Sequence, residues 1–257
     1  MYGLRRAANA LVLLLCCGSA YAAGTSGTLE WARRVELSTP VSGVVSSVSV
    51  EPGDRVAKGA ALVTLDQRGF RAELQRARAE RTRLKQALAE ARRERDRAQE
   101  LYDRTLLSQH DLDLAKIGHT TAQASYEAAE AALTQAKLAL EYSTVRAPFA
   151  GVVLSRPAQV GQTVVSRLRS VPLVVLAASG HVLARTAVEE AAVQRLSVGD
   201  RATVRLGERE FEGHIERLGL EPLEPRTEPL HYAVDVAFDY PHVEQLRAGQ
   251  TVTVVLP

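Results

Sequence analysis

The sequence predicts an α+β protein with several domains: a split β-domain that holds a long inserted α-helical coiled-coil hairpin, followed by a small β-barrel. Three observations predict this architecture. A proline-free run of strong helix formers separates two segments rich in β-branched residues. These two segments carry glycines at the same spacing. A further stretch of alternating apolar residues extends to residue 257.

Residues 1–22 predict a secretory signal peptide. Two arginines precede a short apolar run, and Ala20-Tyr21-Ala22 fits the small-residue pattern of a cleavage site. The apolar run is shorter than the roughly 20 residues that span a bilayer, which favours cleavage over an uncleaved anchor. Cleavage there removes Cys16 and Cys17, although lipidation of one of them is an alternative. We therefore expect a mature chain outside the cytoplasm, without disulfides.

Residues 35–66 predict the first half of the β-domain. Short runs of β-branched residues alternate with serine, which is typical of strands. Turn signals at Glu51-Pro52-Gly53-Asp54 and at Lys58-Gly59 separate these runs. The strand pattern ends at Asp66, where a helical pattern replaces it.

Residues 67–143 predict an antiparallel helical hairpin. Apolar residues recur at alternating three- and four-residue steps in two arms, which a break at residues 104–108 separates. At the rise of an α-helix, each arm is roughly 50 Å long. The seam positions are Phe70, Leu74, Ala77, Leu84, Leu88, Ala91 and Ala98 in the first arm, and Leu112, Ala115, His119, Ala122, Tyr126, Ala129, Leu133, Ala136 and Leu140 in the second.

Polar residues modify this seam. Arg81 and Arg95 interrupt it in the first arm, and we expect His119 in the second arm to be a packing residue rather than a ligand. A two-helix seam buries little area, so we expect neighbouring copies to cover the remaining faces. The ion pairs expected along the outer face of the first arm are Arg76–Glu80, Glu90–Arg93 and Glu94–Arg97.

Residues 145–178 repeat the turn chemistry of residues 35–66. In both segments a glycine follows a proline by three residues, and a second glycine follows the first by ten. This internal repeat predicts that the two segments are halves of one pseudo-symmetric β-domain. The matched positions are Pro40, Gly43 and Gly53 in the first segment, and Pro148, Gly151 and Gly161 in the second.

Residues 179–257, together with residues 28–34, predict the β-barrel. Apolar residues alternate at 182–188, 232–238 and 250–256, as in half-buried strands. Several such strands with one short helical segment are typical of a small barrel.

The order of these parts resembles that of the periplasmic adaptor proteins, also called membrane fusion proteins. The resemblance implies a lipoyl-like β-domain, a docking hairpin and a barrel. It covers almost the whole mature chain, and the stretches that carry it are PVSGVV at 40–45, VEPGDRV at 50–56, VRAPFAGVV at 145–153, the segment from Val188 to Asp200, and LRAGQ at 246–250.

The split β-domain of this family resembles lipoyl and biotinyl carrier domains, which raises covalent cofactor carriage as a rival function. Such carriers present the modified lysine between the two halves of the domain. The corresponding junction here is Leu65-Asp66-Gln67-Arg68, which has no lysine. We therefore expect no cofactor.

No catalytic or metal-binding arrangement stands out, so we expect neither an enzyme nor a metal site. His-Glu-x-x-His, Gly-x-Ser-x-Gly, a phosphate-binding glycine loop and Cys-x-x-Cys are all absent. Met1 is the only methionine, whereas soft Cu(I) sites use several. A net charge of +2 and 5% aromatic residues do not indicate a surface that binds nucleic acid.

The break between the arms carries the candidate site. Family members that dock onto an outer-membrane channel share an Arg-x3-Leu-x6-Ser pattern, and Arg97, Leu101 and Ser108 have this spacing. The resemblance implies that Leu101 packs into a groove between partner helices and that Arg97 donates to partner carbonyls. Local roles are the alternative: Ser108 with Asp111 forms an N-cap, Arg97 pairs with Glu94, and Leu101 joins the seam.

The resemblance therefore implies a periplasmic adaptor subunit of a tripartite efflux or secretion system. Such an adaptor bridges an inner-membrane transporter, here of RND type, to an outer-membrane channel, and it assembles as a homo-oligomeric ring of six copies. The chain departs from the family in one respect, because it ends at Pro257 after the last barrel strand and only a short segment precedes Val35. We expect no full membrane-proximal domain, which favours the alternative of a periplasmic scaffold or regulatory module that does not bridge a pump.

Overall fold

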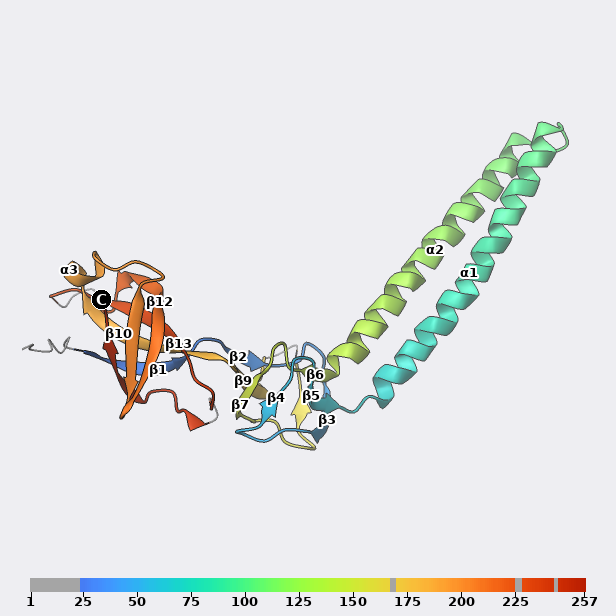
Figure 1. Cartoon of the computed structure of the whole chain (residues 1–257). Coiled ribbons are helices and arrows are strands. Elements are labelled where there is room, and N and C mark those ends of the chain that lie inside the picture. The colour runs from blue at the N-terminus through green and yellow to red at the C-terminus, as the bar shows by residue number, and fades with distance from the viewer. Residues whose placement is uncertain (1–23, 167–169, 225–227, 243–244) are drawn as a thin grey trace, which may run out of the picture. The chain divides into compact units, whose positions relative to one another are not determined.

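The residues that the computed structural model describes are 24–166, 170–224, 228–242 and 245–257 (Figure 1). The predicted signal peptide, with Cys16 and Cys17, lies outside the described residues. Among the described helices, none is both long and apolar enough to cross a bilayer. The chain forms two compact units, and one of them holds the split β-domain and the helical hairpin.

The split β-domain is a sandwich of two sheets. Its strands are β2 (Arg34–Leu37), β3 (Gly43–Val48), β4 (Arg55–Val56), β5 (Ala61–Leu65), β6 (Thr144–Arg146), β7 (Gly151–Ser155), β8 (Thr163–Val164) and β9 (Val174–Ala178). Within the described residues, one four-stranded sheet has the order β2-β9-β7-β4 and the other has the order β6-β5-β3-β8. Both sheets therefore combine strands that precede the hairpin with strands that follow it.

The two halves of the sandwich are related by pseudo-symmetry. The order of the first sheet becomes that of the second when each strand is replaced by its counterpart in the other half. The turns repeat as well: the Gly53 amide donates to the Val153 carbonyl at 2.8 Å, and the Gly161 amide donates to the Val45 carbonyl at 2.9 Å. Both glycines have positive φ, 97° and 86°, a conformation that glycine adopts without steric cost. These contacts confirm the predicted internal repeat.

The core of the sandwich draws on both halves of the domain. Leu62 and Leu65 from β5 are fully buried with Leu173 and Leu176 from the second half. Strands that alternate between the two halves must bury their apolar faces together, so neither half has a core of its own. The sandwich folds as one unit although the hairpin separates its halves in sequence.

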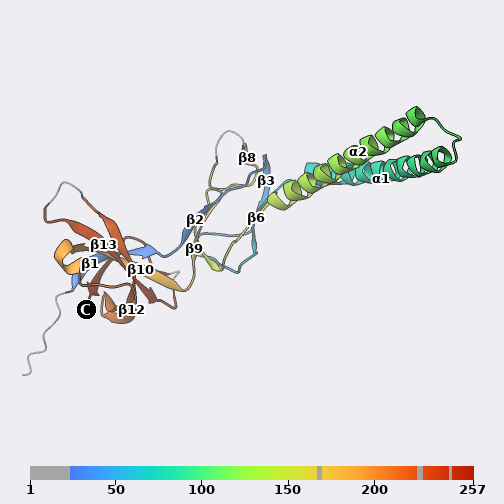
Figure 2. The same cartoon turned by 90° about the horizontal axis from the view of Figure 1, so that it is seen from above.

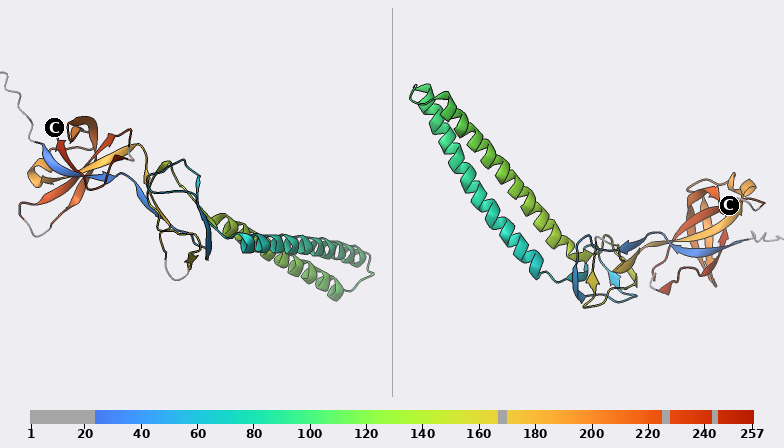
Figure 3. Two further views of the ribbon diagram at one scale, coloured as in Figure 1. Left: turned by 90° about the horizontal axis from the view of Figure 1, so that it is seen from below. Right: turned by 180° about the vertical axis from the view of Figure 1, so that it is seen from behind.

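The hairpin consists of α1 (Arg68–Asp103) and α2 (Gln109–Tyr142), which lie side by side in every view (Figure 1, Figure 2, Figure 3). The helix limits agree with the arms and the break that the sequence predicts. The buried residues all lie at predicted seam positions: Leu74, Ala77 and Ala98 on α1, and Leu112, Ala129 and Ala136 on α2.

Two details of the predicted hairpin are wrong. Phe70 packs against the core of the sandwich instead of joining the seam, because the first turn of α1 directly follows β5. Arg76 pairs with Glu73 at 3.6 Å rather than with Glu80, whose partner is Arg83. Pairs three residues apart and pairs four residues apart both lie on one helix face, so sequence alone does not choose between them. The other two predicted ion pairs, Glu90–Arg93 and Glu94–Arg97, are present.

A polar network crosses the seam at Arg81. Its guanidinium donates to the Tyr126 hydroxyl at 2.9 Å and to the Glu130 carboxylate at 3.0 Å, and Tyr126 also donates to Glu130. The hydrogen bond from Tyr126, and then that from Arg81, lowers the pKa of Glu130 below its ordinary value. Charge-assisted bonds between the helices favour one antiparallel register, because a shift would leave Arg81 without its partners.

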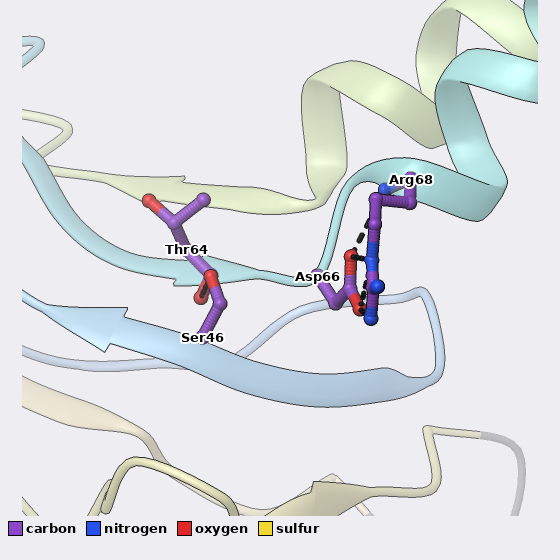
Figure 4. Close-up of polar contacts among 4 residues, drawn as sticks. All are labelled: Ser46, Thr64, Asp66 and Arg68. Carbon is purple, nitrogen blue, oxygen red and sulfur yellow. Dashed lines mark hydrogen bonds and ion pairs between the residues drawn. The ribbon is translucent and has the colours of Figure 1, made fainter.

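The junction between β5 and α1 is stabilised by Asp66 and Arg68 (Figure 4). The Asp66 carboxylate accepts bonds from the Arg68 amide at 3.0 Å and from its guanidinium. The side-chain bond from Arg68, followed by the amide bond, lowers the pKa of Asp66 to about 2. One residue on, Gln67 donates to the Ser143 and Thr144 hydroxyls, which joins the start of α1 to the segment after α2.

Ser46 marks an irregularity in the strand beside this junction. The register of β3 with β5 shifts between Val45 and Ser47, and the Ser46 hydroxyl donates to the Thr64 carbonyl at 2.9 Å (Figure 4). The pairing of β7 with β9 shifts at the equivalent place, between Val153 and Ser155. A bulge in each half preserves the pseudo-symmetry of the sandwich.

The second region is a closed barrel. Its strands are β1 (Thr25–Trp31), β10 (His181–Glu189), β11 (Arg201–Leu206), β12 (Arg209–Pro222), β13 (His231–Asp239) and β14 (Thr251–Val255), and α3 (Glu190–Val193) is a short helix after β10. Within the described residues, their order is β1-β10-β13-β12-β11-β14. With the split sandwich and the inserted hairpin, this barrel confirms the predicted fold class.

A buried carboxylate connects three strands of the barrel. Asp235 on β13 accepts bonds from Arg185 on β10 at 2.7 and 3.0 Å, and Arg217 on β12 lies 3.5 Å away. Because Asp235 is almost fully buried, its charge needs these partners, and the pairing holds the three strands in one register.

Candidate partner-binding site at the hairpin tip

The tip begins where α1 ends in a Schellman motif. The Thr105 amide donates to the Tyr102 carbonyl at 2.8 Å, and the Leu106 amide donates to the Leu101 carbonyl at 2.9 Å. This pair of bonds closes the last turn of a helix when the residue after the cap is left-handed. Thr105 has this conformation, with φ of 58°.

Thr105 is an unusual residue for this position. Glycine normally takes it, because a β-branched side chain crowds the left-handed backbone. Among the described residues, Thr105 is the only residue other than glycine with positive φ. Backbone strain of this kind is concentrated at functional sites, where the surrounding structure maintains it. The strained turn therefore singles out the tip from the remainder of the hairpin.

The turn presents an apolar side chain to solvent. Leu106 is 70% exposed, whereas Leu101 one turn earlier is partly buried. Leu112 on the first turn of α2 is buried and anchors the opposite side of the tip. Exposed large apolar side chains cost little singly, but one on a turn fixed by two backbone bonds is well placed to contact a partner.

Ser108 begins α2 as its N-cap. Its backbone is extended, and its hydroxyl accepts the Asp111 amide at 3.2 Å and lies 2.6 Å from the Asp111 carboxylate. The capping role that the sequence offered as an alternative for Ser108 is therefore present. Asp111 also places a negative charge in the first turn of α2, where the helix dipole favours it.

Arg97 lies one turn before Leu101 on the same helix. Its side chain is 67% exposed and its guanidinium lies 3.6 Å from Glu94, a distance typical of a weak surface ion pair. Residues four apart share a helix face, so Arg97 and Leu101 point the same way. The weak pair with Glu94 leaves most of the guanidinium exposed to solvent.

The structure thus places all three predicted residues at or next to the tip: Arg97 and Leu101 on α1, and Ser108 at the start of α2. Sequence reasoning missed Thr105 and Leu106. No glycine or asparagine marks the left-handed position. The sequence therefore indicated the break between the two helices but not the conformation of its backbone. The apolar Leu106-Leu107 pair inside a break that is otherwise polar was the available signal.

At the place where a carrier domain presents its lysine, this chain has the Asp66–Arg68 ion pair and the start of α1. No group of three or more His, Cys, Asp or Glu side chains positioned to hold a metal ion occurs in the part of the chain that the structure describes.

The domain family described as CzcB-like, barrel-sandwich hybrid domain matches residues 33–171. Multidrug resistance protein MdtA of Pectobacterium carotovorum subsp. carotovorum (strain PC1) is 30% identical over 140 residues, which are 54% of this chain and 34% of that protein. Macrolide export protein MacA of Escherichia coli O157:H7 is 31% identical over 193 residues, which are 69% of this chain and 52% of that protein. The chain thus spans about a third to half of the length of these relatives.

Solved structures share the fold at lower sequence identity. The membrane fusion protein Spr0693 from Streptococcus pneumoniae R6 superposes with a TM-score of 0.70 and 19% identity, and the match covers 90% of this chain and 97% of that one. A MacA-MexA chimeric protein containing the Pseudomonas aeruginosa MexA α-hairpin domain gives a TM-score of 0.66 and 22% identity, with 90% and 76% covered. At these identities the likeness shows the fold alone.

Proposed function

Since this chain belongs to the membrane fusion protein family, through its CzcB-like barrel-sandwich hybrid domain, we propose that it is the adaptor of a tripartite efflux or secretion system in the periplasm. In this role it bridges an inner-membrane transporter, of RND type, to an outer-membrane channel. The adaptor is a passive coupler: the transporter supplies the energy, and the adaptor seals the path between the membranes.

The hairpin tip is the observation that carries this proposal. A spacer needs only a closing loop, whereas this tip has a strained turn with an exposed leucine at its apex. The Arg-x3-Leu-x6-Ser spacing lies at this same end of the hairpin. A tip of this kind fits an apolar groove between the helix ends of a channel protein.

Each tip residue has a separate role in the proposed contact. Leu101 and Leu106 fill apolar sockets between partner helices, and Leu106 extends the surface beyond the three residues that the spacing identifies. Arg97 leaves Glu94 and donates charge-assisted bonds to partner carbonyls. Ser108 keeps its capping bond to Asp111, so that its hydroxyl orients the tip and bonds across the interface.

A ring of copies is the second part of the proposal. Besides the seam, each helix has an uncharged series of exposed residues at three- and four-residue steps on the edge opposite its partner. Packing the α2 series of one copy against the α1 series of the next makes a head-to-tail contact, which closes into a ring. We propose six copies. The two series are Leu114, Ile117, Thr121, Ala124, Ala128, Ala131 and Gln135 on α2, and Ala72, Gln75, Ala79, Thr82, Gln86 and Ala89 on α1.

Crosslinking and substitution at position 101 test the bridging role. Leu101→Cys, in a mature chain without other cysteines, is expected to crosslink in cells to an outer-membrane channel identified by mass spectrometry. Leu101→Asp is expected to abolish export with unchanged helical circular dichroism, because a carboxylate cannot enter an apolar socket. Leu101→Met keeps the apolar volume and is the matched control, expected to retain export.

Two results would contradict the bridging role. One is normal export by the Leu101→Asp variant, and the other is the absence of a channel crosslink from a folded Leu101→Cys chain. Either result would favour a periplasmic scaffold that keeps the fold without contacting a channel.

A further inference from the structure

The hairpin has an open cleft between α1 and α2, in the half nearer the tip. Its volume is about 630 Å³. The charged side chains in its lining are Lys85, Arg92, Arg93, Arg95 and Asp96 from α1, and α2 contributes the ionisable side chains of His119 and Tyr126. The cleft lies outside the proposed docking residues at the tip.

The cleft occurs where the seam is least suited to packing. Ala91 and Ala122 are seam residues here and fill little volume, and the next seam positions toward the tip are Arg95 and His119. Arg95 keeps a third of its side chain exposed. A cation at a half-buried seam position costs stability relative to leucine, because it loses part of its hydration. This stretch of the seam therefore has charged side chains at positions where apolar side chains would pack better.

The lining has an excess of positive charge. Four side chains carry a fixed positive charge, and Asp96 is the single carboxylate among the described lining residues. Asp96 accepts a bond from Arg95 at 3.0 Å, and Arg92 lies 4.0 Å away. The hydrogen bond from Arg95, followed by the nearby charges of Arg95, Arg92 and His119, lowers the pKa of Asp96. Asp96 is thus the shared ion-pair partner of Arg92 and Arg95.

Lys85 adds to this excess. In the described parts of the chain its ammonium makes no hydrogen bond or ion pair. Its positive charge nevertheless contributes to the lowered pKa of Glu130. Arg93 at the edge of the cleft differs, because it pairs with Glu90, just as Arg76, Arg83 and Arg97 each pair with a carboxylate three residues earlier. Among the described residues, Arg92 and Arg95 share Asp96 and Lys85 has no ion pair, so a positive surplus remains at the cleft.

Carboxylates on the α1 face of a second copy are poor candidates to neutralise this charge. The glutamates that line the outer face of α1 already have partners in their own chain, as at Glu73, Glu80 and Glu94. The α1 face of a second copy would have to break those pairs to neutralise the cleft. A small group with two negative charges and several acceptor oxygens meets the need without such a cost.

From these observations we infer that the cleft binds a phosphate group. Arginine and lysine donors that converge on a cleft match the several oxygens of phosphate, which arginine binds in bidentate fashion. The group can come from free phosphate compounds or from the headgroup of a phospholipid, since both present the same oxygens. The inference does not rest on the proposed bridging function, because binding is measured on the purified chain.

Binding to two probes tests this inference. Pyrophosphate is titrated into the mature protein by calorimetry, and vesicles of phosphatidylglycerol in phosphatidylcholine are tested by co-sedimentation. Lys85→Glu with Arg92→Glu is expected to weaken binding by roughly tenfold or more, because both changes reverse a charge at the cleft. Lys137→Glu with Arg78→Glu makes the same changes at exposed hairpin positions outside the cleft, and is expected to bind within roughly twofold of the unaltered protein.

The possible results distinguish the two sources of the phosphate group from a diffuse charge effect. Binding of pyrophosphate that the first pair of substitutions removes supports a site for free phosphate compounds, and selective binding of the vesicles supports a headgroup site. Equal loss with both pairs of substitutions would show a diffuse charge effect and overturn the inference. The absence of binding of either probe to the unaltered protein at millimolar concentration would also overturn the inference. So would a Lys85→Glu, Arg92→Glu variant that loses self-association but binds both probes normally.

Discussion

The sandwich and the hairpin are built on different physical principles. Thirteen buried residues, contributed by both halves of the chain, pack into one cluster in the described sandwich. The corresponding cluster of the hairpin has three buried residues, Leu74, Ala77 and Ala136. Burial of apolar area therefore stabilises the sandwich, whereas helix propensity, side-chain pairs and caps stabilise the hairpin.

This difference bears on function. A region held together by long-range packing tolerates little change at its core, and its surface is free to vary. The hairpin has only a thin seam, so most of each helix remains available to other molecules. The two exposed uncharged series, the cationic cleft and the tip all lie on the hairpin. The thin seam accounts both for the small buried core of the hairpin and for the large helix surface that remains available for contacts.

The largest expected effect compares one leucine from each region. Leu62→Ala in the fully buried sandwich core is expected to lower the free energy of unfolding by about 3 kcal/mol, through lost burial and a cavity. Leu74→Ala in the hairpin seam is expected to cost roughly 1–2 kcal/mol, because the buried cluster around it is small and alanine favours the helix. Denaturant unfolding followed by circular dichroism measures both.

Hydrogen exchange separates global from local effects in these two variants. Leu62→Ala should reduce the protection of amides in all strands of the sandwich, and Leu74→Ala should affect the hairpin amides first. Equal loss of stability in the two variants would contradict the proposed contrast between the regions.

A charge on the exposed series of α2 is the next test. Ala128→Glu is expected to reduce self-association of the mature protein by roughly tenfold or more, because it buries a carboxylate between copies. Ala79→Glu, on the α1 series, is expected to act similarly if the contact is head-to-tail. Thr134→Glu, an exposed position on α2 outside the series, is the control. Sedimentation velocity across a concentration range measures the effect, and unchanged association in both alanine variants would argue against the ring contact.

A smaller effect is expected at the cap of α2. Ser108→Ala removes the acceptor for the Asp111 amide and should destabilise the tip by about 1 kcal/mol. Ser108→Thr keeps a hydroxyl and should lose less. Exchange rates of the amides in the first turn of α2 report the change. If export fails in Ser108→Ala while these rates stay normal, the hydroxyl acts on the partner instead of on the cap.

The smallest effect concerns the junction below the hairpin. Because Arg68 lowers the pKa of Asp66 to about 2, from an ordinary value of 3.8, the ion pair stabilises the folded state above about pH 4. This contribution is lost as the pH falls toward 2. Carboxyl chemical shifts should give a midpoint near 2 for Asp66, and Arg68→Gln should raise it. A midpoint near 4 in the unaltered protein would contradict the contact.

Much of the candidate site could be predicted from local spacing. Arg97, Leu101 and Ser108 were identified by their separation and by the break between two periodic arms. Thr105 and Leu106 were not, because threonine carries no signal for a left-handed backbone. Only the closing bonds of the last turn of α1 show that Leu106 is held at the apex of the tip.

Sequence by itself determined the helix limits, the paired glycine turns and the capping serine. Each of these depends on neighbours within a few residues, so periodicity and turn chemistry specify it. Tertiary structure decided which strands share a sheet, that Phe70 joins the sandwich core, and that the charges around Lys85 form a cleft. Those features depend on residues far apart in the chain, whose pairing is set by the packing of the whole domain. The same division explains why the limits of the hairpin helices were predicted, whereas the strand order of the sandwich was not.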